Sequence, residues 1–335
     1  MKKIISFLKT DIKIINSYFL FTIVLIILVC VGYSSYALFS FTKTSTNVIE
    51  GTVGELKKSG ADTLIKLTDN KDNSGLYTIT HEADTTLQIG TNESITEYRY
   101  RGASPKNYVT FNNEVWRIIG VFPTDDGTGK IENRIKLIRN ESIGNYYWNT
   151  SSSNNWARPA TLNTYLNETY LSSLTSEAQN MIGSSKYYLG GFSSNNITSV
   201  YMYKYERKIS ESSSYNGNNP TNWLGKLALM YASDYGYASA NCETKVLYNL
   251  RDSTQDLRAC NDTNWLYNIK TYEWLLSQLS IININTFSVN IHGYIETAAT
   301  VYNNQYAVRP VVYLTSTVKI TGGDGTSSSP YTFGL

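Results

Sequence analysis

The 335-residue sequence predicts an α+β domain behind a single membrane-spanning helix. The helix is predicted by an uncharged apolar run, Ser17–Phe41, which exceeds the about 20 residues that a bilayer crossing needs. The sheet is predicted by short runs rich in Val, Ile and aromatic residues, which recur between turn residues from position 108 onward. Helical spacing of apolar residues is convincing only between positions 159 and 182. We therefore expect a mixed or antiparallel sheet with one or two short helices.

The charge flanking the apolar run predicts its orientation. Residues 1–16 carry four lysines and one aspartate, a net charge of +3, and an excess of lysine keeps its end of a span in the cytoplasm. We expect residues 1–16 to be a cytoplasmic tail, 17–41 an uncleaved anchor, and the rest to lie outside the cell. The alternative is a cleaved signal peptide, since Ser35 and Ala37 suit a signal peptidase. The length of the apolar run favours the anchor, and both interpretations export the domain.

The composition of the exported part excludes some partners. The total charge is +2, so the part after the tail has a net charge of about −1, which provides no basic field for nucleic acid. The chain has 28 tyrosines and only 17% charged residues. Such a surface offers hydroxyls, amides and flat rings to sugars or other neutral polymers, although Tyr and Asn are also common in strands and turns for structural reasons.

Three cysteines fall into two groups. Cys30 lies inside the apolar run, where it is expected to be a small apolar filler. Cys242 and Cys260 are the only two beyond it. In an oxidising exterior, a pair about twenty residues apart predicts a disulfide that stabilises the fold by about 3 kcal/mol. Two unpaired buried thiols are the alternative.

Residues 42–98 are expected to form an extracellular stalk, possessing some local structure but no core of its own. Glycine, serine and asparagine separate its short apolar runs, such as Leu64–Leu67. The main domain, residues 99–335, opens with two strands, 108–111 and 114–122, joined by Asn112-Asn113 as a two-residue turn. A third strand follows at 135–138.

The helical part begins after Pro159 and continues with apolar residues three or four positions apart, and Ser176 with Gln179 is expected to cap a second short helix. Strand-like runs then return at 186–189, 225–230, 272–276, 287–289, 308–314 and 318–321. The stretches 193–221 and 232–264 are rich in Asn, Ser and Gly and are expected to be long loops. Long loops on a compact scaffold are where recognition usually occurs.

Several phrases from Tyr98 to Leu335 together resemble a large group of surface proteins from low-GC Firmicutes: NYVTFNNEVWRIIGVF, IKLIRNESIGNY, ATLNTYLNETYLSSL, GKLALMYASDYGYA, NWLYN, YEWLLS and VRPVVYLTSTVKITGGDGTSSSPYTF. The resemblance implies a C-type-lectin-like or formylglycine-generating-enzyme-like fold. Such relatives have a strand with the pattern Trp-x-Leu, which we call the tryptophan strand, and often carry Ser-Pro directly after it. Here the corresponding stretch is Trp274-Leu275-Leu276-Ser277, and Gln278 follows. The resemblance implies a cell-surface protein and no established activity.

Catalytic and metal-binding patterns are weak. His81-Glu82 lacks the second histidine of a zinc-protease motif, and His292 is expected in a turn between two strands. No nucleophile elbow or phosphate loop occurs, so we expect neither a metal nor a cofactor. Glu206, Asp234 and Glu273 are candidates for a glycosidase-type pair, but each is expected to be a surface charge.

The C-terminal half concentrates aromatic residues around the predicted disulfide. We take as candidate ligand-binding residues Trp223, Asp234, Tyr235, Trp265 and Trp274, because rings stack on sugars and a carboxylate accepts hydrogen bonds from hydroxyls. The alternative is that each ring belongs to the core. Arg309, before Pro310, is expected to pair with a carboxylate and tie the last long strand in place.

The sequence thus predicts a membrane-anchored cell-surface protein, N-terminus inside, whose exported domain recognises or adheres to a glycan, another surface polymer or a protein. A hydrolase acting on the cell wall or a glycan is one alternative. A structural component of the envelope is the other.

Overall fold

The computed structural model describes residues 21–23, 25–29, 58–87, 93–193, 198–208, 218–247, 257–268 and 271–335. The chain divides into two compact units, Met1–Lys57 and Lys58–Leu335. In the first unit the described residues are helical and exposed, and most of the predicted anchor, 17–41, lies outside the described part. Among the residues described, no helix is both long and apolar enough to cross a membrane.

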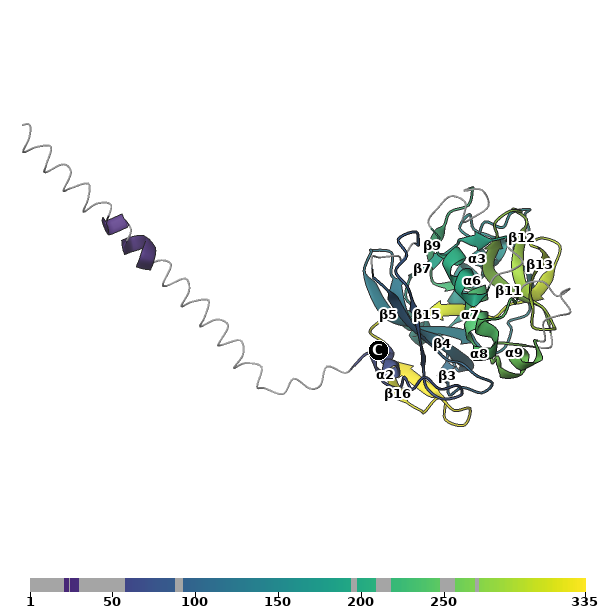
Figure 1. Cartoon of the computed structure of the whole chain (residues 1–335), viewed down its shortest axis with the longest axis horizontal. Helices are drawn as coiled ribbons and strands as arrows, with labels where there is room; N and C mark the ends of the chain where they lie inside the picture. Colours follow the sequence, from purple (N-terminus) through teal and green to yellow (C-terminus); the bar gives the residue numbers. More distant parts are fainter. Residues whose placement is uncertain are drawn as a thin grey trace, which may run out of the picture. The chain divides into compact units, whose positions relative to one another are not determined.

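The second unit is a mixed α+β structure, mostly sheet with short helices, which confirms the coarse fold class (Figure 1). Its largest sheet has nine strands in the order β10-β15-β5-β4-β3-β17-β16, with β2 on β4 and β1 on β2. The bounds are β1 Tyr77–His81, β2 Ile95–Arg99, β3 Tyr108–Phe111, β4 Glu114–Asp125, β5 Ile131–Arg139, β10 Leu227–Ala228, β15 Val311–Tyr313, β16 Lys319–Gly322 and β17 Tyr331–Gly334.

The predicted hairpin is confirmed. β3 and β4 pair antiparallel from Tyr108↔Arg117 to Phe111↔Glu114, and both turn residues, Asn112 and Asn113, have positive φ values of 56° and 58°. Asparagine tolerates this left-handed conformation, which the tight two-residue turn requires. The third predicted strand is β5, which pairs with β4 along nearly its whole length.

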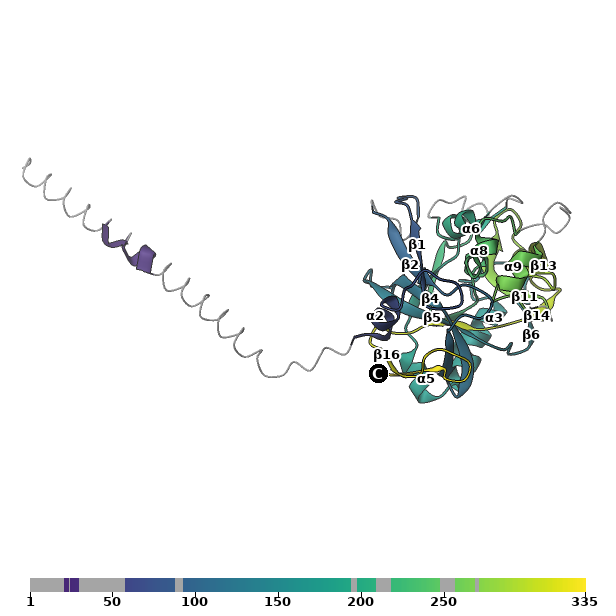
Figure 2. The same cartoon turned by 60° about the horizontal axis from the view of Figure 1, so that its bottom comes forward.

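The compact unit begins about forty residues before the predicted boundary at residue 99. Helix α2, Gly60–Ile65, packs on β5 and β16, near the C-terminal end of the chain (Figure 2). Strand β2 pairs with β4 where Gly120 leaves room, since a Cβ there would lie 2.0 Å from the carbonyl oxygen of Tyr98. Residues 58–87 and 93–98 therefore belong to the domain, and the predicted stalk is too long. These elements are short and find their core in distant strands, so their own sequence shows none.

The second sheet has six strands in the order β13-β12-β11-β14-β6, with β8 paired to β11. The bounds are β6 Asn145–Tyr147, β8 Gly191–Phe192, β11 Glu273–Leu279, β12 Asn285–Val289, β13 Ile295–Thr300 and β14 Gln305–Ala307. Strands β7, Ser185–Tyr188, and β9, Asn222–Gly225, form a separate antiparallel pair. Every residue of β11 is buried, including Glu273 and Gln278, and four of its seven residues are apolar.

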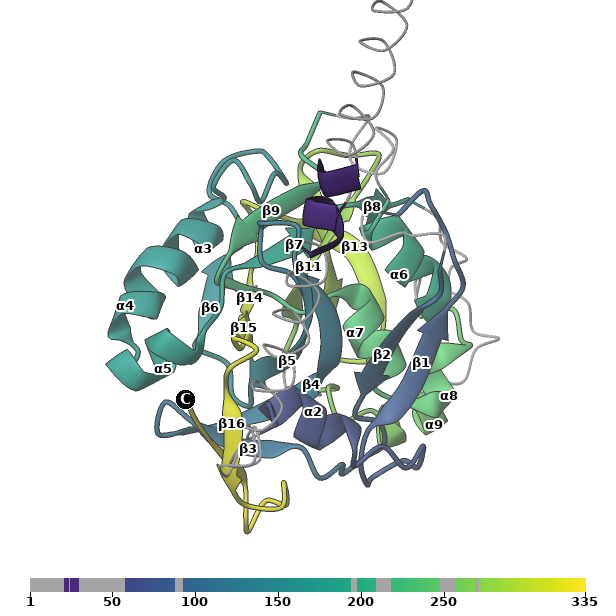
Figure 3. The same cartoon turned by 90° about the vertical axis from the view of Figure 1, so that its left-hand side faces the viewer.

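The predicted helical region is confirmed as one helical run that passes through α3, Thr161–Thr164, a π-helical turn η1, Tyr165–Tyr170, and α4, Leu171–Ser173. Helix α5, Ser176–Met181, is capped by Thr175, one residue before the predicted cap, whose hydroxyl accepts a hydrogen bond from Ala178 N. Figure 3 shows α3, α4 and α5 grouped together, away from α6, α8 and α9.

Four helices lie where loops are predicted: α6 Ser199–Glu206, α7 Ala232–Tyr237, α8 Ala240–Glu243 and α9 Arg258–Thr263. The prediction of two continuous long loops is therefore wrong over these residues, whereas 194–197, 209–217 and 248–256 lie outside the described part. Helix α7 is buried on all sides, so it has no amphipathic period, and it contains Gly236. A short helix with these properties gives no signal in sequence.

Candidate functional site

Four of the five predicted ligand-binding side chains lie in the interior. Asp234 and Trp274 are each 1% exposed, and Tyr235 and Trp265 are also buried. The polar atoms of the three rings are satisfied inside the protein: Trp265 Nε1 donates to Tyr100 O at 3.0 Å, Trp274 Nε1 to Tyr146 O at 2.7 Å, and Tyr235 Oη to Gly293 O at 3.0 Å. These rings hold distant segments together and present no face to solvent.

Trp223 is the exception, since it is half-buried on β9. Its ring packs against Trp156 and Tyr187, with centroids 6.2 and 5.8 Å away. The structure does not bring Trp223 together with the other four residues as one exposed patch.

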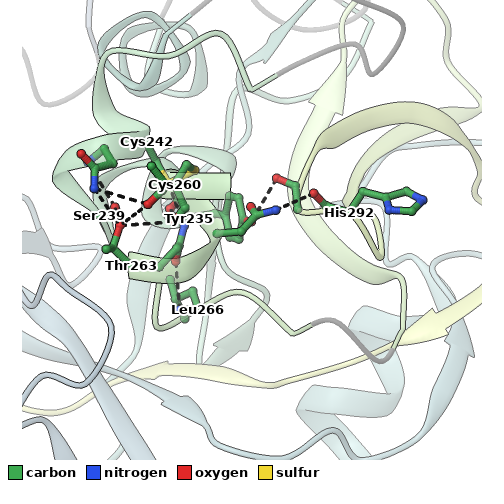
Figure 4. The surroundings of a disulfide bond; sticks show 12 residues. Tyr235, Ser239, Cys242, Cys260, Thr263, Leu266 and His292 are labelled. Carbon is green, nitrogen blue, oxygen red and sulfur yellow. Dashed lines mark hydrogen bonds between the residues drawn. A yellow bond between two sulfur atoms is a disulfide. The ribbon is translucent and has the colours of Figure 1, made fainter. Parts of the chain in front are cut away.

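Cys242 and Cys260 lie at disulfide distance, as predicted, and join α8 to α9 with their Cα atoms 4.8 Å apart (Figure 4). Hydrogen bonds on both sides reinforce the junction, because Ser239 and Thr263 share a bond of 2.7 Å and Asn264 Nδ2 donates to Tyr235 O at 2.8 Å. The bond closes a loop of 18 residues, for which loop closure corresponds to about 3 kcal/mol.

His292 lies in the turn between β12 and β13, as predicted. Its backbone N donates to Asn290 Oδ1 at 2.8 Å, and Gly293 follows with φ of 79°. The imidazole points away from the disulfide (Figure 4). It contributes to no cluster of titratable groups among the residues described.

A cluster of buried ionisable side chains, which we call the ionic cluster, lies in the interior of the unit. Its members come from β1, β2, β5, α6 with the residue after it, and α7, and all are less than a tenth exposed: His81, Glu97, Arg99, Lys136, Glu206, Arg207 and Asp234. Asp234 is the one predicted site residue that the structure places in this cluster. Of the others, Glu206 was expected at the surface and His81 in the stalk, and the remaining four were missed.

Asp234 is the centre of the cluster. Its Oδ1 accepts from Arg99 Nη1 at 2.9 Å, and its Oδ2 accepts from Lys136 Nζ at 2.5 Å and from Tyr231 N at 2.9 Å. Burial alone would raise the pKa of Asp234, but the two cations outweigh it and lower that pKa. Burial lowers the pKa of Lys136 to about 8, despite the attraction of the carboxylate.

Glu97 forms a second ionic centre next to the first. Arg99 Nε donates to its Oε1 at 2.6 Å, and His81 Nε2 lies 3.1 Å from the same oxygen. Burial would raise the pKa of Glu97, but Arg99 and His81 outweigh it and lower that pKa. The imidazole of His81 stacks on Tyr203 with a centroid distance of 3.5 Å. His81, which was predicted to lie in the stalk, is therefore a buried part of the domain.

Glu206 is held differently. Its carboxylate accepts from Ser233 N at 3.1 Å and from the hydroxyls of Ser233 and Ser277 at 2.5 and 2.7 Å. Burial raises the pKa of Glu206, although Arg207 acts against this shift. The hydroxyls tie α6 to α7 and β11, so this carboxylate is a structural junction between three elements.

Access to the ionic cluster is minimal. The cavity beside it has a volume of about 10 Å³, with Glu97, Lys186 and Arg207 among its lining residues. This is room for about one water molecule. The cluster has perturbed acids and bases, as catalytic sites do, but among the residues described the cavity beside it has no room for a substrate. Among the residues described, these ion pairs and hydrogen bonds hold β1, β2, β5, α6 and α7 together.

Arg309 forms a second buried ion pair, as predicted. Its Nε and Nη2 donate to the two oxygens of Glu273, both at 2.7 Å, and Nη2 also donates to Leu266 O at 2.8 Å. The expectation that Glu206, Asp234 and Glu273 are surface charges is wrong, because each has buried partners far away in the chain. The three carboxylates serve separate junctions.

An open hollow lies elsewhere on the unit, between α2 and the β16–β17 hairpin. Its volume is about 430 Å³, within the range of about 300 to 1,000 Å³ that is usual for small-molecule sites. Its lining includes Leu67, Lys106, Ile320, Asp324 and Tyr331. None of these was among the predicted site residues. Among the described residues, no group of three or more His, Cys, Asp or Glu side chains is placed to hold a metal ion.

No family model, curated protein or solved structure matches this chain.

Proposed function

We propose that this protein is anchored in the cell membrane by its N-terminal apolar run and acts outside the cell as a non-catalytic recognition or adhesion module. Its ligand would be a glycan or another surface polymer. The tail of residues 1–16 would stay in the cytoplasm, as its net charge of +3 favours. Residues between the anchor and Lys58 would act as a short spacer.

The observation that carries the extracellular location is the pairing of Cys242 with Cys260. Disulfides form and persist in oxidising compartments and are rare where thiols are kept reduced. This pair is also buried, so it supports the fold and is not a reactive dithiol at the surface. A structural disulfide after an apolar N-terminal run is the combination expected of an exported domain.

The contrast between the two polar regions supports recognition over catalysis. The ionic cluster has shifted pKa values but room for about one water molecule, whereas the hollow is open and has no cluster of acids and bases. A hydrolase would need a carboxylate pair next to substrate, so it is the weaker alternative. A structural envelope component would use neither region for a ligand.

The finer fold and lineage are part of the same proposal. Three strands support a C-type-lectin-like domain of the Firmicutes surface group that the motifs resemble. They are β11 with Trp274, the glycine-bearing strand β4, and β15, which directly follows Arg309-Pro310. This assignment depends on the order of the motifs.

The test is an array of glycans and cell-wall polymer fragments probed with the full chain in detergent, with mass spectrometry of whatever is retained. We expect specific, saturable retention of a ligand whose mass is unchanged. A shortened product would make the protein a hydrolase, and the absence of any retained ligand would favour a structural role.

A further inference from the structure

We propose that the hollow between α2 and the β16–β17 hairpin binds a short peptide that carries a free ammonium group, a free carboxylate and an apolar side chain. This inference rests on the proposed recognition function and names the chemical class that this hollow would take. It follows from the charges at the hollow, the close backbone contacts of its walls and its exposed apolar surface.

Two opposite charges line the same hollow. Lys106 precedes β3 and Asp324 lies in the β16–β17 turn, and both are exposed. Hydrogen bonds from Thr326 lower the pKa of Asp324, and the positive charge of Lys106 adds to that effect. No ion pair within 4.0 Å joins Lys106 to any described residue. A ligand with both charges would satisfy both groups at once.

The turn holds Asp324 in one orientation. Its Oδ1 accepts hydrogen bonds from Thr326 N at 3.0 Å and from Thr326 Oγ1 at 2.7 Å, while these bonds leave Oδ2 for a ligand. Gly323 and Gly325 on either side have φ values of 80° and 78°, which favour glycine. A Cβ on Gly325 would lie 2.3 Å from Lys106 O, so the glycine lets the β16–β17 turn approach the backbone of residue 106 closely.

The walls are also fixed by close backbone contacts. A Cβ on Gly75 would lie 1.9 Å from Leu67 O, so the loop after α2 can approach this closely only because residue 75 is glycine. Leu67 and Ile320 contribute apolar surface to the hollow, and Leu67 is 47% exposed. An apolar side chain of a ligand would cover this surface, which is otherwise in contact with water.

The lining favours a peptide over a neutral sugar. Sugar recognition usually needs the flat face of an aromatic ring, and Tyr331, which lines the hollow, is only 6% exposed. A neutral sugar would also leave the charges of Lys106 and Asp324 unmatched. A zwitterion with an apolar side chain matches both charges and the apolar surface of Leu67 and Ile320.

The experiment is calorimetric titration of the full chain in detergent with the tripeptide Ala-Leu-Ala at low ionic strength, where exposed charges are least screened. We expect saturable binding of one peptide per chain. The same peptide with an acetylated N-terminus and an amidated C-terminus should bind about tenfold more weakly or not at all. Maltotriose, a neutral sugar, should give no heat of binding.

Two variants and two matched controls locate the site. Asp324→Asn keeps the oxygen that accepts from Thr326, and Lys106→Gln keeps most of the side-chain length, so each should weaken binding about three- to tenfold while the fold is retained. Asp126→Asn is the control for the first, since Asp126 makes the same two bonds to Thr128 in another Asp-Gly-Thr turn. Lys130→Gln, at an exposed lysine, is the control for the second.

The outcomes separate this inference from the proposed function. Equal binding of the blocked peptide or of maltotriose would overturn charge recognition, and unchanged binding by both Asp324→Asn and Lys106→Gln would overturn the location. If the array retains a polymer but the full chain does not bind Ala-Leu-Ala, this inference fails and the recognition function stands. If the peptide binds and no polymer is retained, the hollow is confirmed as a peptide site. The proposal that the ligand is a glycan or another polymer is then wrong.

Discussion

Asp234 shows best how one residue determines the interior of this domain. Its carboxylate forms ion pairs with Arg99 of β2 and Lys136 of β5. It also accepts a hydrogen bond from the backbone N of Tyr231, the residue that caps α7. Isolated charges in the interior would be strongly unfavourable, so each of these three groups depends on the others. The ion pairs thereby couple the N-terminal strands to a helix in the second half of the chain.

Asp234→Asn is expected to destabilise the domain by about 3 to 5 kcal/mol, because it removes one partner of buried pairs and leaves Lys136 and Arg99 without their counter-charge. The free energy of unfolding in urea measures the effect. Glu168→Gln, at an exposed carboxylate on η1, is the control and should change stability by less than about 0.5 kcal/mol. A loss for Asp234→Asn as small as the control would show that the pairs are not coupled as described.

The pH dependence of stability follows from the lowered pKa of Asp234. The folded pKa lies below the reference value of 3.8, so as pH falls the unfolded chain takes up this proton first. The stability that Asp234 contributes is therefore complete above pH about 5 and is lost as pH falls through the folded pKa. Urea unfolding of the wild type and of Asp234→Asn from pH 6 to pH 3 should give curves that converge towards acid. A difference in unfolding free energy between the two proteins that does not change with pH would contradict the lowered pKa of Asp234.

At the residue scale the sequence indicated Asp234 as a candidate ligand-binding residue, whereas the structure places it in the buried ionic cluster. Asp234 was selected because aromatic residues surround it, yet its partners lie 135 and 98 positions away, and no local pattern reports such pairs. A signal existed for Glu97 and Arg99, since residues two apart on a strand share a face. It was missed because residues 95–99 were not recognised as a strand.

Among the elements, the β3–β4 turn gives the sharpest prediction. Asn113 has φ of 58°, where a β-branched residue is strongly disfavoured. Asn113→Val should lower the free energy of unfolding by about 1 to 2 kcal/mol, whereas Asn113→Gly should remain within about 0.5 kcal/mol of the wild type. Chemical denaturation distinguishes the two. Equal effects of valine and glycine would mean that the turn is not left-handed.

The α8–α9 pair depends on its disulfide. Replacing both Cys242 and Cys260 by Ser should lower the stability by about 3 kcal/mol through the entropy of the closed loop. Thermal unfolding measures the loss, and mass spectrometry without reductant should find the bridge in the wild type. Cys30→Ser, in the apolar run, is the control and should leave both readings unchanged. Two free thiols in the wild type would exclude the bridge.

Elements with a strong local signature could be predicted, as the hairpin and the helical run after Pro159 show. Elements that depend on tertiary contacts could not. Helix α2 buries Leu64 against the large sheet, and α7 has a glycine and no exposed face. In both cases the packing partner, and not the intrinsic propensity, decides the structure.

The compact unit buries the ionic cluster in its interior, and its open hollow lies at the edge of the large sheet. The sequence indicated the α+β class, the cysteine pair and the pairing of Arg309, all of which the structure confirms. It could not indicate the hollow, because α2 and the β16–β17 hairpin that form it are far apart in the chain. The proposed biology nevertheless depends first on where this unit lies.

The most direct test of that location is labelling of intact cells that express the full chain with an amine reagent that cannot cross membranes, followed by mass spectrometry. We predict modification of the exposed Lys106 and Lys130 in intact cells, and of Lys2 and Lys3 only after the membrane is opened. Lys106 and Lys130 that remain unmodified until the membrane is opened would contradict an extracellular domain, and with it the proposed function.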